Sequence, residues 1–593
     1  MNETIRPIQS NLKLRYRSAA IKIMEKHMTS LPLRHRAVLS LAVVTLAAWP
    51  VSARQSPTGH VHYATPGPDA AQTGPNGELA PRLQNLGPHT FPVTIRSARG
   101  QLFINQGLNL SYAFNHAEAG RAFREAARLD PDSAMAYWGQ ALVLGPNINA
   151  AMDPADEARA HDAIRRAVVL KPKASPRERA LIDALAQRYT GRTDDRVARD
   201  RAYADAMARV AKQYPADLDI AVLYAESVMD LRPWGYWMRD GAPYEGVADA
   251  VRTVESVMRR RPTHPGALHL YIHLMEYMEP KKAEVAADRL LTLMPAAGHI
   301  VHMPAHIYQR IGRYPDAIKS NQMAIAADED YIRQCRAQGL YPLSYYPHNL
   351  HFLWFSASVD GQSRLALESA RKAASKIDDA TLKQIPALAA FRIVPYYALT
   401  RFGRWDEMLA EPAPGTDNAY LHGTYQYARG VALVAKGRLA EAEQALGVVK
   451  KMLADPSMSS PLASPNSGGA VLAIAPAVLE GRIAMARKQY DTAIAHFERA
   501  VRLEDGLVYT EPTEWHYPPR LALGAALLAA NRPSEAETVY WEDLKRNPEN
   551  GWALSGVVRA QRAQNKTEQA AIVEARAKNA WARADGDWRT ILD

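Results

Sequence analysis

Cysteine is almost absent from this sequence, with Cys335 alone among 593 residues. One cysteine excludes an intrachain disulfide, so the chain must be stable through packing, which its length permits. It also excludes the thiolate clusters that bind structural zinc or iron–sulfur centres. Any metal site in this chain therefore depends on other ligands.

Long hydrophobic runs and strand-like alternation are missing too. No run of about 18 or more apolar residues occurs, which argues against a full membrane span. Phenylalanine is scarce at 9 residues, whereas alanine, leucine and arginine abound, and this mix favours helix over strand. The sequence has no GxxxxGK[ST] loop, no GxGxxG after a strand and no GxSxG elbow, so nucleotide use and serine hydrolysis are unsupported.

The N-terminal 53 residues have the pattern of an export signal. Lys and Arg are scattered over residues 1–36, the apolar stretch AVLSLAVVTLAAW follows at Ala37–Trp49, and small residues precede a cleavage point after Ala53. This pattern predicts a signal peptide over residues 1–53 and a periplasmic or secreted protein that is not transmembrane after cleavage. A short uncleaved anchor helix is the alternative.

Most of the positive charge belongs to this leader. Residues 1–53 hold 8 Lys/Arg and 2 Asp/Glu, a net charge of +6, which leaves +4 of the total +10 for the rest of the chain. So small an excess gives little reason to expect nucleic acid as a partner.

The chain after the leader divides into a linker and a helical region. Residues 54–95 are rich in Pro, Gly and small polar residues, and we expect a flexible linker there. Over residues 96–593, apolar residues recur at spacings of 3 and 4, and the breaks carry Gly, Pro, Asn or Asp. This periodicity predicts helices throughout.

Segments of the helical region resemble one another. Lys488–Asp505 and Asn531–Pro548 each have a turn residue, then a small alanine, then apolar positions four and seven residues later. They resemble tetratricopeptide repeats, helix–turn–helix units of about 34 residues with small residues at fixed positions. Gly481, Ala493 and Ala500 match three of those positions.

The resemblance implies an all-α fold in which helix hairpins stack into a right-handed superhelix, an α-solenoid, over residues 96–593. In that family the first helix of each repeat lines a concave face that normally holds a partner peptide. A non-repeating helical bundle is the alternative fold.

Histidine is concentrated in one part of the repeat region. Half of the 16 histidines after residue 53 lie between residues 264 and 351. His269 and His273 are four residues apart, His302 and His306 are also four apart, and the second pair follows the first by 33 residues. Because residues i and i+4 share a helix face, the two pairs should project from equivalent faces of successive repeats.

The tetratricopeptide resemblance implies that seven histidines face the groove, at positions 2, 5 or 9 of first helices. They are His269, His273, His299, His302, His306, His348 and His351.

Imidazole is the commonest neutral ligand for transition metals, and two histidines at i and i+4 form half of many helical zinc sites. We therefore expect the seven histidines to contribute a metal site in the concave groove. Copper is the first choice, because histidine ligation without cysteine in an oxidising compartment suits Cu(II), and zinc is the second. Glu276, one turn after His273, is a candidate ligand, ligand-orienting group or catalytic general base.

The function remains open between two classes. A catalytic copper site would make the protein an oxidoreductase acting on a small molecule or peptide. The alternative is a non-enzymatic scaffold whose groove binds a peptide or partner protein. Two aromatic, loop-like segments, Arg232–Gly246 and Thr510–Arg520, are candidates to wall or close the groove.

The stretches YIHLMEY and HMPAHIYQRIGRYPDA, which carry His273 and His302, also resemble a group of secreted bacterial tetratricopeptide proteins with no firm activity. This second resemblance supports the fold more than the chemistry.

Overall fold

The computed structural model of the chain describes residues 77–335 and 340–587. The predicted signal peptide and residues 54–76 lie outside these ranges and stay predictions. Within the described ranges the secondary structure is helical, with three isolated β-bridges and no strand. The all-α prediction is confirmed for these ranges, and their first helix begins at Ala98, close to the expected start of the helical region.

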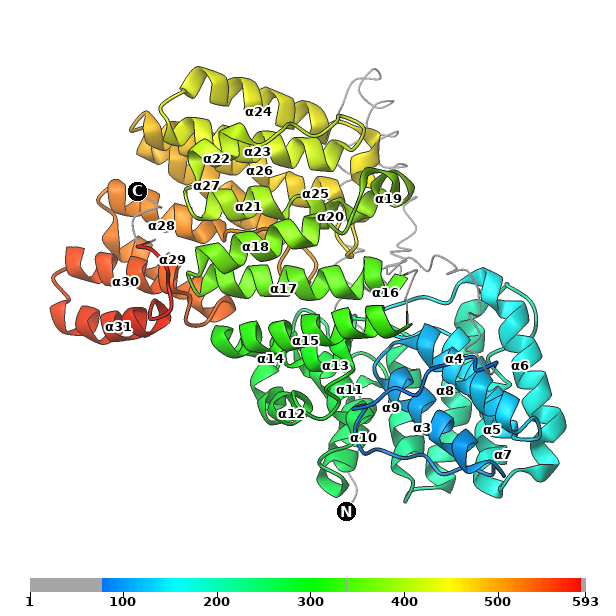
Figure 1. The fold of residues 1–593 in the computed structure, drawn as a ribbon. Helices are drawn as coiled ribbons and strands as arrows, with labels where there is room; N and C mark the ends of the chain where they lie inside the picture. The colour runs from blue at the N-terminus through cyan, green and yellow to red at the C-terminus, as the bar shows by residue number, and fades with distance from the viewer. Residues whose placement is uncertain (1–76, 336–339, 588–593) are drawn as a thin grey trace, which may run out of the picture. The chain divides into compact units, whose positions relative to one another are not determined.

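Figure 1 labels the helices by their order in the chain. The first half of the chain contains α3 (Ala98–Tyr112), α4 (His116–Leu129), α5 (Ala134–Leu144), α6 (Glu157–Leu170), α7 (Pro176–Leu185), α8 (Arg196–Gln213), α9 (Leu218–Met229), α10 (Val247–Arg260), α11 (Pro265–Met275), α12 (Glu284–Leu290), α13 (Gly298–His302), α14 (Pro304–Arg310), α15 (Tyr314–Cys335) and α16 (Leu340–Leu343).

The second half contains α17 (Tyr345–Val359), α18 (Ser363–Ala374), α19 (Asp379–Gln384), α20 (Ala389–Arg392), α21 (Val394–Arg401), α22 (Trp405–Ala410), α23 (Ala419–Ala435), α24 (Leu439–Leu453), α25 (Gly468–Leu472), α26 (Ile474–Ala486), α27 (Tyr490–Asp505), α28 (Pro519–Ala529), α29 (Pro533–Arg546), α30 (Gly551–Ala563) and α31 (Thr567–Ala580). Short 3-10 turns lie between some of them: Pro154–Asp156, Lys171–Lys173, Pro280–Ala283, Pro386–Leu388 and Pro456–Ser459.

Neighbouring helices pack as successive hairpins. Helix α3 packs on α4, α17 on α18, α23 on α24, α26 on α27, α28 on α29 and α30 on α31, and the second helix of one hairpin packs on the next hairpin in turn. Such nearest-neighbour stacking is the packing of an α-solenoid. The chain therefore has the tetratricopeptide-type architecture that its sequence pattern indicates.

A repeated contact between glycine and an aromatic ring explains why small residues recur in the pattern. A Cβ atom added at Gly481 would lie 2.5 Å from the ring of Phe497. Added at Gly524 or Gly556, it would lie 2.4 Å from the ring of Tyr540. Only glycine lets these helix backbones approach the ring, so the small residue and the aromatic residue are two halves of one packing unit.

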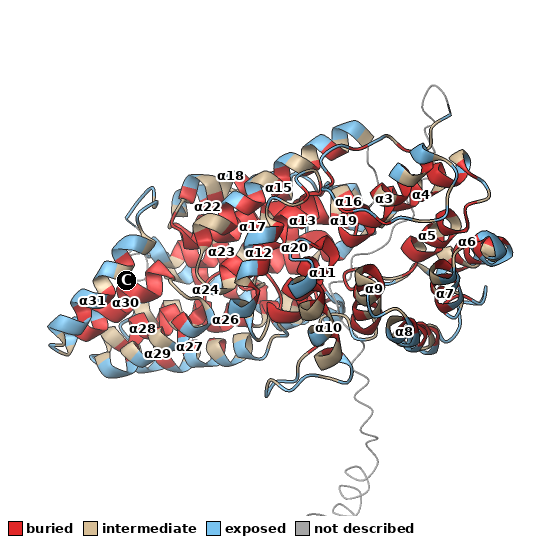
Figure 2. Cartoon of the chain, turned by 90° about the horizontal axis from the view of Figure 1, so that it is seen from below, coloured by how far each residue is buried: buried red, intermediate tan, exposed pale blue. Residues whose placement is uncertain are grey.

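The core runs along the contacts between helices (Figure 2). Exposed residues gather on the outer faces of helices such as α6 and α31. Among the described residues, the helical stretch Gly468–Ala486 has the length and composition to cross a membrane, but 61% of it is buried within the protein. Packing against neighbouring helices accounts for its hydrophobicity.

Residues 77–97 differ from the flexible linker that we expected up to residue 95. Phe91 is 1% exposed and stacks on Trp138 with ring centroids 6.0 Å apart. Two amide side chains of α3 hold its backbone: Phe91 N–H donates to Asn105 Oδ1 at 2.9 Å, and Gln101 Nε2 donates to Phe91 O at 2.9 Å. These bonds satisfy backbone groups that no regular secondary structure pairs, so the segment is fixed despite its Pro-rich composition.

Candidate metal centre

Four helices in the middle of the chain bring six histidines together. His269 and His273 come from α11, His299 and His302 from α13, and His306 from α14. The sixth, His348, comes from α17, which packs on α13. The five residues from α11, α13 and α14 are at most 2% exposed, and His348 is half-buried.

The six rings form two sets of three. In each set, one ring nitrogen from each histidine lies within 4.8 Å of those of the other two. The first set is His269, His273 and His299, and the second set is His302, His306 and His348.

The first pair of rings presents two bare nitrogens to each other. His269 Nδ1 lies 2.6 Å from the backbone oxygen of Tyr112, and His273 Nδ1 lies 3.2 Å from Glu276 Oε1. Both partners accept hydrogen bonds, so each neutral ring carries its proton on Nδ1. The two Nε2 atoms, which then hold only lone pairs, face each other at 3.1 Å.

The second pair repeats this arrangement. His302 Nδ1 lies 2.7 Å from Asn321 Oδ1, and the orientation of that amide is fixed because Asn321 Nδ2 donates to Ala317 O at 2.8 Å. His306 Nδ1 lies 2.9 Å from a carboxylate oxygen of both Glu276 and Glu511. The Nε2 atoms of His302 and His306 face each other at 2.9 Å.

Two facing lone pairs in a buried site require a cation between them, either a shared proton or a metal ion. Two nitrogens that bind one ion at about 2.0–2.1 Å lie about 2.8–3.4 Å apart for bond angles of about 90–110°. The separations of 3.1 Å and 2.9 Å fall within that range. Burial lowers the pKa of His269 and of His273 below the usual value, which disfavours a proton in the first pair, whereas Glu276 and Glu511 raise the pKa of His306 to about 9 and favour a proton in the second.

His299 has no hydrogen-bond partner among the described residues, on either ring nitrogen, although it is 2% exposed. A buried, unsatisfied polar group costs about 1–3 kcal/mol, so native structures rarely keep one without a reason. A metal ion shared with His269 and His273 would satisfy one of these nitrogens.

Two buried carboxylates lie behind the rings. Burial alone would lower the pKa of His306, but the charges of Glu276 and Glu511 outweigh it and raise that pKa to about 9. Burial opposes ionisation of Glu276, and the neighbouring His306 and His273 reverse this and lower its pKa. Burial raises the pKa of Glu511 to about 7. Both oxygens of Glu276 face Nδ1 atoms, which suits a residue that orients ligands.

Aromatic side chains enclose the histidines. Phe114, from the α3–α4 turn, has its ring centroid 4.4 Å from that of His269. The ring centroids of Trp234 and His273 are 5.1 Å apart, and those of Phe352 and His302 are 4.5 Å apart. The predicted open groove is therefore filled at this point, and the rings face one another inside the protein.

The structure brings together most, but not all, of the site residues predicted from the sequence. Six of the seven candidate histidines converge with Glu276, whereas His351 stacks on Trp354 at 5.1 Å and 15° and joins neither set among the described residues. Trp234 belongs to the Arg232–Gly246 segment that we expected to close the site. Glu511 belongs to the predicted aromatic wall, but nothing in the sequence indicates its contact with His306, 205 residues away in the chain.

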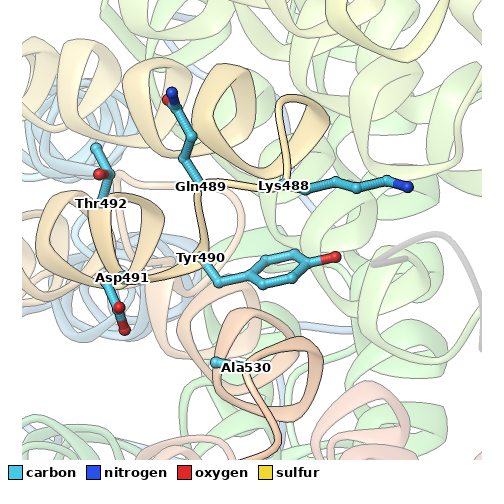
Figure 3. Close-up of a pocket in the computed structure, with 6 residues that line it drawn as sticks. All are labelled: Lys488, Gln489, Tyr490, Asp491, Thr492 and Ala530. Atoms are coloured by element: carbon cyan, nitrogen blue, oxygen red, sulfur yellow. The ribbon is translucent and has the colours of Figure 1, made fainter.

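A surface pocket lies elsewhere, at the turn between α26 and α27 (Figure 3). It encloses about 360 Å³ and is lined by Lys488, Gln489, Tyr490, Asp491, Thr492 and Ala530. None of the histidine sets contributes to it.

Comparison with known proteins gives no family for this chain. No family model and no curated protein matches the sequence. Its structure is similar to human IFIT1 in a dimer with m7Gppp-AAAA, at 13% identity over 82% of this chain and 91% of that chain, with a TM-score of 0.30. It is also similar to yeast Tom70, at 11% identity over 83% of this chain and 91% of that chain, with a TM-score of 0.27.

Similarities at these TM-scores carry no argument about function. The assignment of the fold rests on the helix packing described above. The resemblance to secreted bacterial tetratricopeptide proteins gains no support from the comparisons, and the expectation that nucleic acid is not a partner stays untested.

Proposed function

We propose that this chain is an exported tetratricopeptide-type protein that binds transition-metal ions through its buried histidines, copper first and zinc second. The observation that carries the proposal is the pair of facing Nε2 atoms at His269 and His273, 3.1 Å apart with both Nδ1 atoms hydrogen-bonded to oxygen acceptors. A second pair of facing Nε2 atoms, 2.9 Å apart at His302 and His306, makes a chance approach of two rings a poor explanation.

The donor set fits the proposed metals. Every ligand in the two histidine sets is an imidazole, and cysteine is absent from the site, which suits Cu(II) or Zn(II) better than metals that prefer oxygen ligands. Three protein ligands leave a coordination position open, as in catalytic sites. Copper in such a position would supply one-electron redox chemistry, and oxidation of a small molecule is the activity that we propose for it.

The burial of the site limits the substrate. All histidines of the first set are at most 2% exposed, and Phe114 and Trp234 contact their rings. A small molecule fits such an enclosed site better than a peptide. Glu511, whose pKa burial raises to about 7, is poised near neutral pH to accept a proton from a reactant, while Glu276 orients His273 and His306.

A non-enzymatic scaffold for a peptide or partner protein is the second candidate. The stacked hairpins favour it, because such arrays commonly present extended binding surfaces. It does not explain why the chain buries six histidines with facing nitrogens.

Elemental analysis of the protein exported by its own leader tests the proposal. We expect copper or zinc at no less than one ion per chain, and we expect the double variant His273→Gln/His306→Gln to lose it while circular dichroism shows the same helix content. The variant His161→Gln, outside the cluster, is the control and should keep the metal. Metal-free wild-type protein that stays empty after incubation with Cu(II) and Zn(II) would leave the scaffold as the better function.

A further inference from the structure

We infer that the six histidines form two separate metal sites, one held by His269, His273 and His299 and the other by His302, His306 and His348. This inference rests on the proposed function and specifies it as a binuclear centre. Each pair of facing nitrogens has the spacing for an ion of its own, so we assign one ion to each pair.

The two sets are copies of one arrangement, related by the repeat. His269 and His302 are 33 residues apart, and so are His273 and His306. Each set is completed by a histidine from the following repeat, His299 for the first and His348 for the second. In the tetratricopeptide pattern both of these residues occupy position 2, and the two pairs occupy positions 5 and 9. A stacked repeat that builds one three-histidine site therefore builds the second in the same way.

Each set also has its own phenylalanine. The ring centroid of Phe114 lies 4.4 Å, 6.0 Å and 5.6 Å from the ring centroids of His269, His273 and His299, respectively.

Phe352 plays the same part in the second set. Its ring lies 4.5 Å, 4.5 Å and 4.8 Å from the rings of His302, His306 and His348. One apolar ring against all three ligands of a set keeps water from that side and holds the imidazoles in place. One such ring beside each set is what we expect if each set is a separate site.

Glu276 joins the two sets. Its Oε1 lies 3.2 Å from His273 Nδ1, and its Oε2 lies 2.9 Å from His306 Nδ1. One carboxylate thus orients one ligand of each site. The rings of His273 and His306 have centroids 5.9 Å apart, so the two ions would be near neighbours.

Copper loading of the full chain tests the inference. We expect wild-type protein to bind one Cu(II) ion for each of the two histidine sets, with an electron paramagnetic resonance spectrum broadened by the neighbouring spin. His299→Leu and His348→Leu, which each remove one ligand from one set, should halve the tightly bound copper and give the narrow spectrum of an isolated Cu(II) ion. His351→Leu, on the same helix as His348 but outside both sets, should leave the copper content and the spectrum unchanged.

The outcomes separate this inference from the proposed function. One copper ion per wild-type chain, lost completely in either variant, would show a single site and overturn the binuclear inference while the metal-binding function survives. No tightly bound copper in wild-type protein would overturn both. The wild-type stoichiometry and spectrum decide between these outcomes even if one of the variants fails to fold.

Discussion

The Nε2 atoms of His302 and His306 face each other at 2.9 Å, while an oxygen of Asn321 lies 2.7 Å from His302 Nδ1 and one of Glu276 lies 2.9 Å from His306 Nδ1. Because Glu276 and Glu511 raise the pKa of His306 to about 9, the metal-free pair shares a proton that a bound metal ion would displace. Three side chains lie at the Nδ1 atoms of these rings and should therefore control metal binding without touching the metal: Asn321, Glu276 and Glu511.

Asn321→Ala removes the acceptor that orients His302. We expect metal affinity to fall by about 10- to 100-fold, because the ring can then turn or exchange its tautomer. Competition with a chelator of known affinity measures the change. Asn550→Ala is the matched control, since Asn550 is also a buried amide, 1% exposed, but it caps α30 far along the chain. Equal affinity in the Asn321→Ala and wild-type proteins would contradict the orienting role.

Glu276→Gln and Glu511→Gln should differ in how many of the two bound ions they weaken. Glu276 contacts a histidine of each set, whereas Glu511 contacts His306 alone among the six. We expect Glu276→Gln to weaken both bound ions by about 10-fold or more, and Glu511→Gln to weaken one. Isothermal titration with Cu(II) resolves the two steps. If Glu511→Gln weakened the binding of both ions and Glu276→Gln weakened only one, Glu276 would not be the residue that links the two sets.

Acid should remove the contribution of three buried histidines to the stability of the metal-free protein. Burial lowers the pKa of His269, His299 and His302 well below the usual value. The unfolded chain protonates these rings at about pH 6.5, so below that pH it binds more protons than the folded chain. The free energy of unfolding should then fall by up to about 1.4 kcal/mol per pH unit for each ring.

His306 works in the opposite direction. Burial opposes its charge, but Glu276 and Glu511 raise its pKa to about 9, so its contribution is complete below about pH 6.5 and is lost as the pH rises through about 9. Urea unfolding of chelator-treated protein from pH 4 to pH 10 measures both effects. Burial raises the pKa values of Glu511 and Asp328 to about 7, and such carboxylates change stability in the opposite direction over this range, so the comparison is made with the His299→Leu variant. Equal slopes of unfolding free energy against pH in the wild-type and His299→Leu proteins between about pH 6.5 and pH 5 would contradict the burial of a neutral ring.

Two glycines in helices test the repeat packing. Gly524→Ala places a Cβ 2.4 Å from the ring of Tyr540, and we expect a loss of about 1–3 kcal/mol in the free energy of unfolding. Gly447→Ala is the matched control, because a Cβ there meets nothing within 4 Å, and we expect a gain of about 0.5–1 kcal/mol. Thermal unfolding followed by circular dichroism compares them. Similar stability in both variants would mean that the glycine–tyrosine contact is not a packing constraint.

The sequence was informative where the repeat dictates position. The spacing of His269, His273, His302 and His306 places both pairs on equivalent faces, because a helix period and a repeat period together fix direction. His299 follows from the same register. Pro304 would disrupt a helix interior, but it occupies the first position of α14, and the His302 and His306 nitrogens face each other across it.

Contacts from outside the repeat could not be predicted in this way. Phe114 and Glu511 reach the site from segments more than 150 residues away, and no local spacing encodes such an approach. His351 has the expected repeat position, but a neighbour three residues on, Trp354, stacks on its ring. The order of residues 77–97 depends on amide side chains of α3, so their Pro-rich composition alone was misleading.

An anomalous difference map from a copper-loaded crystal, recorded at the copper absorption edge, tests the central claim most directly. We expect a strong peak between the Nε2 atoms of His269 and His273 and another between those of His302 and His306, each about 2.0–2.1 Å from its ligands. Copper density confined to surface residues, with none between these ring nitrogens, would contradict the metal centre.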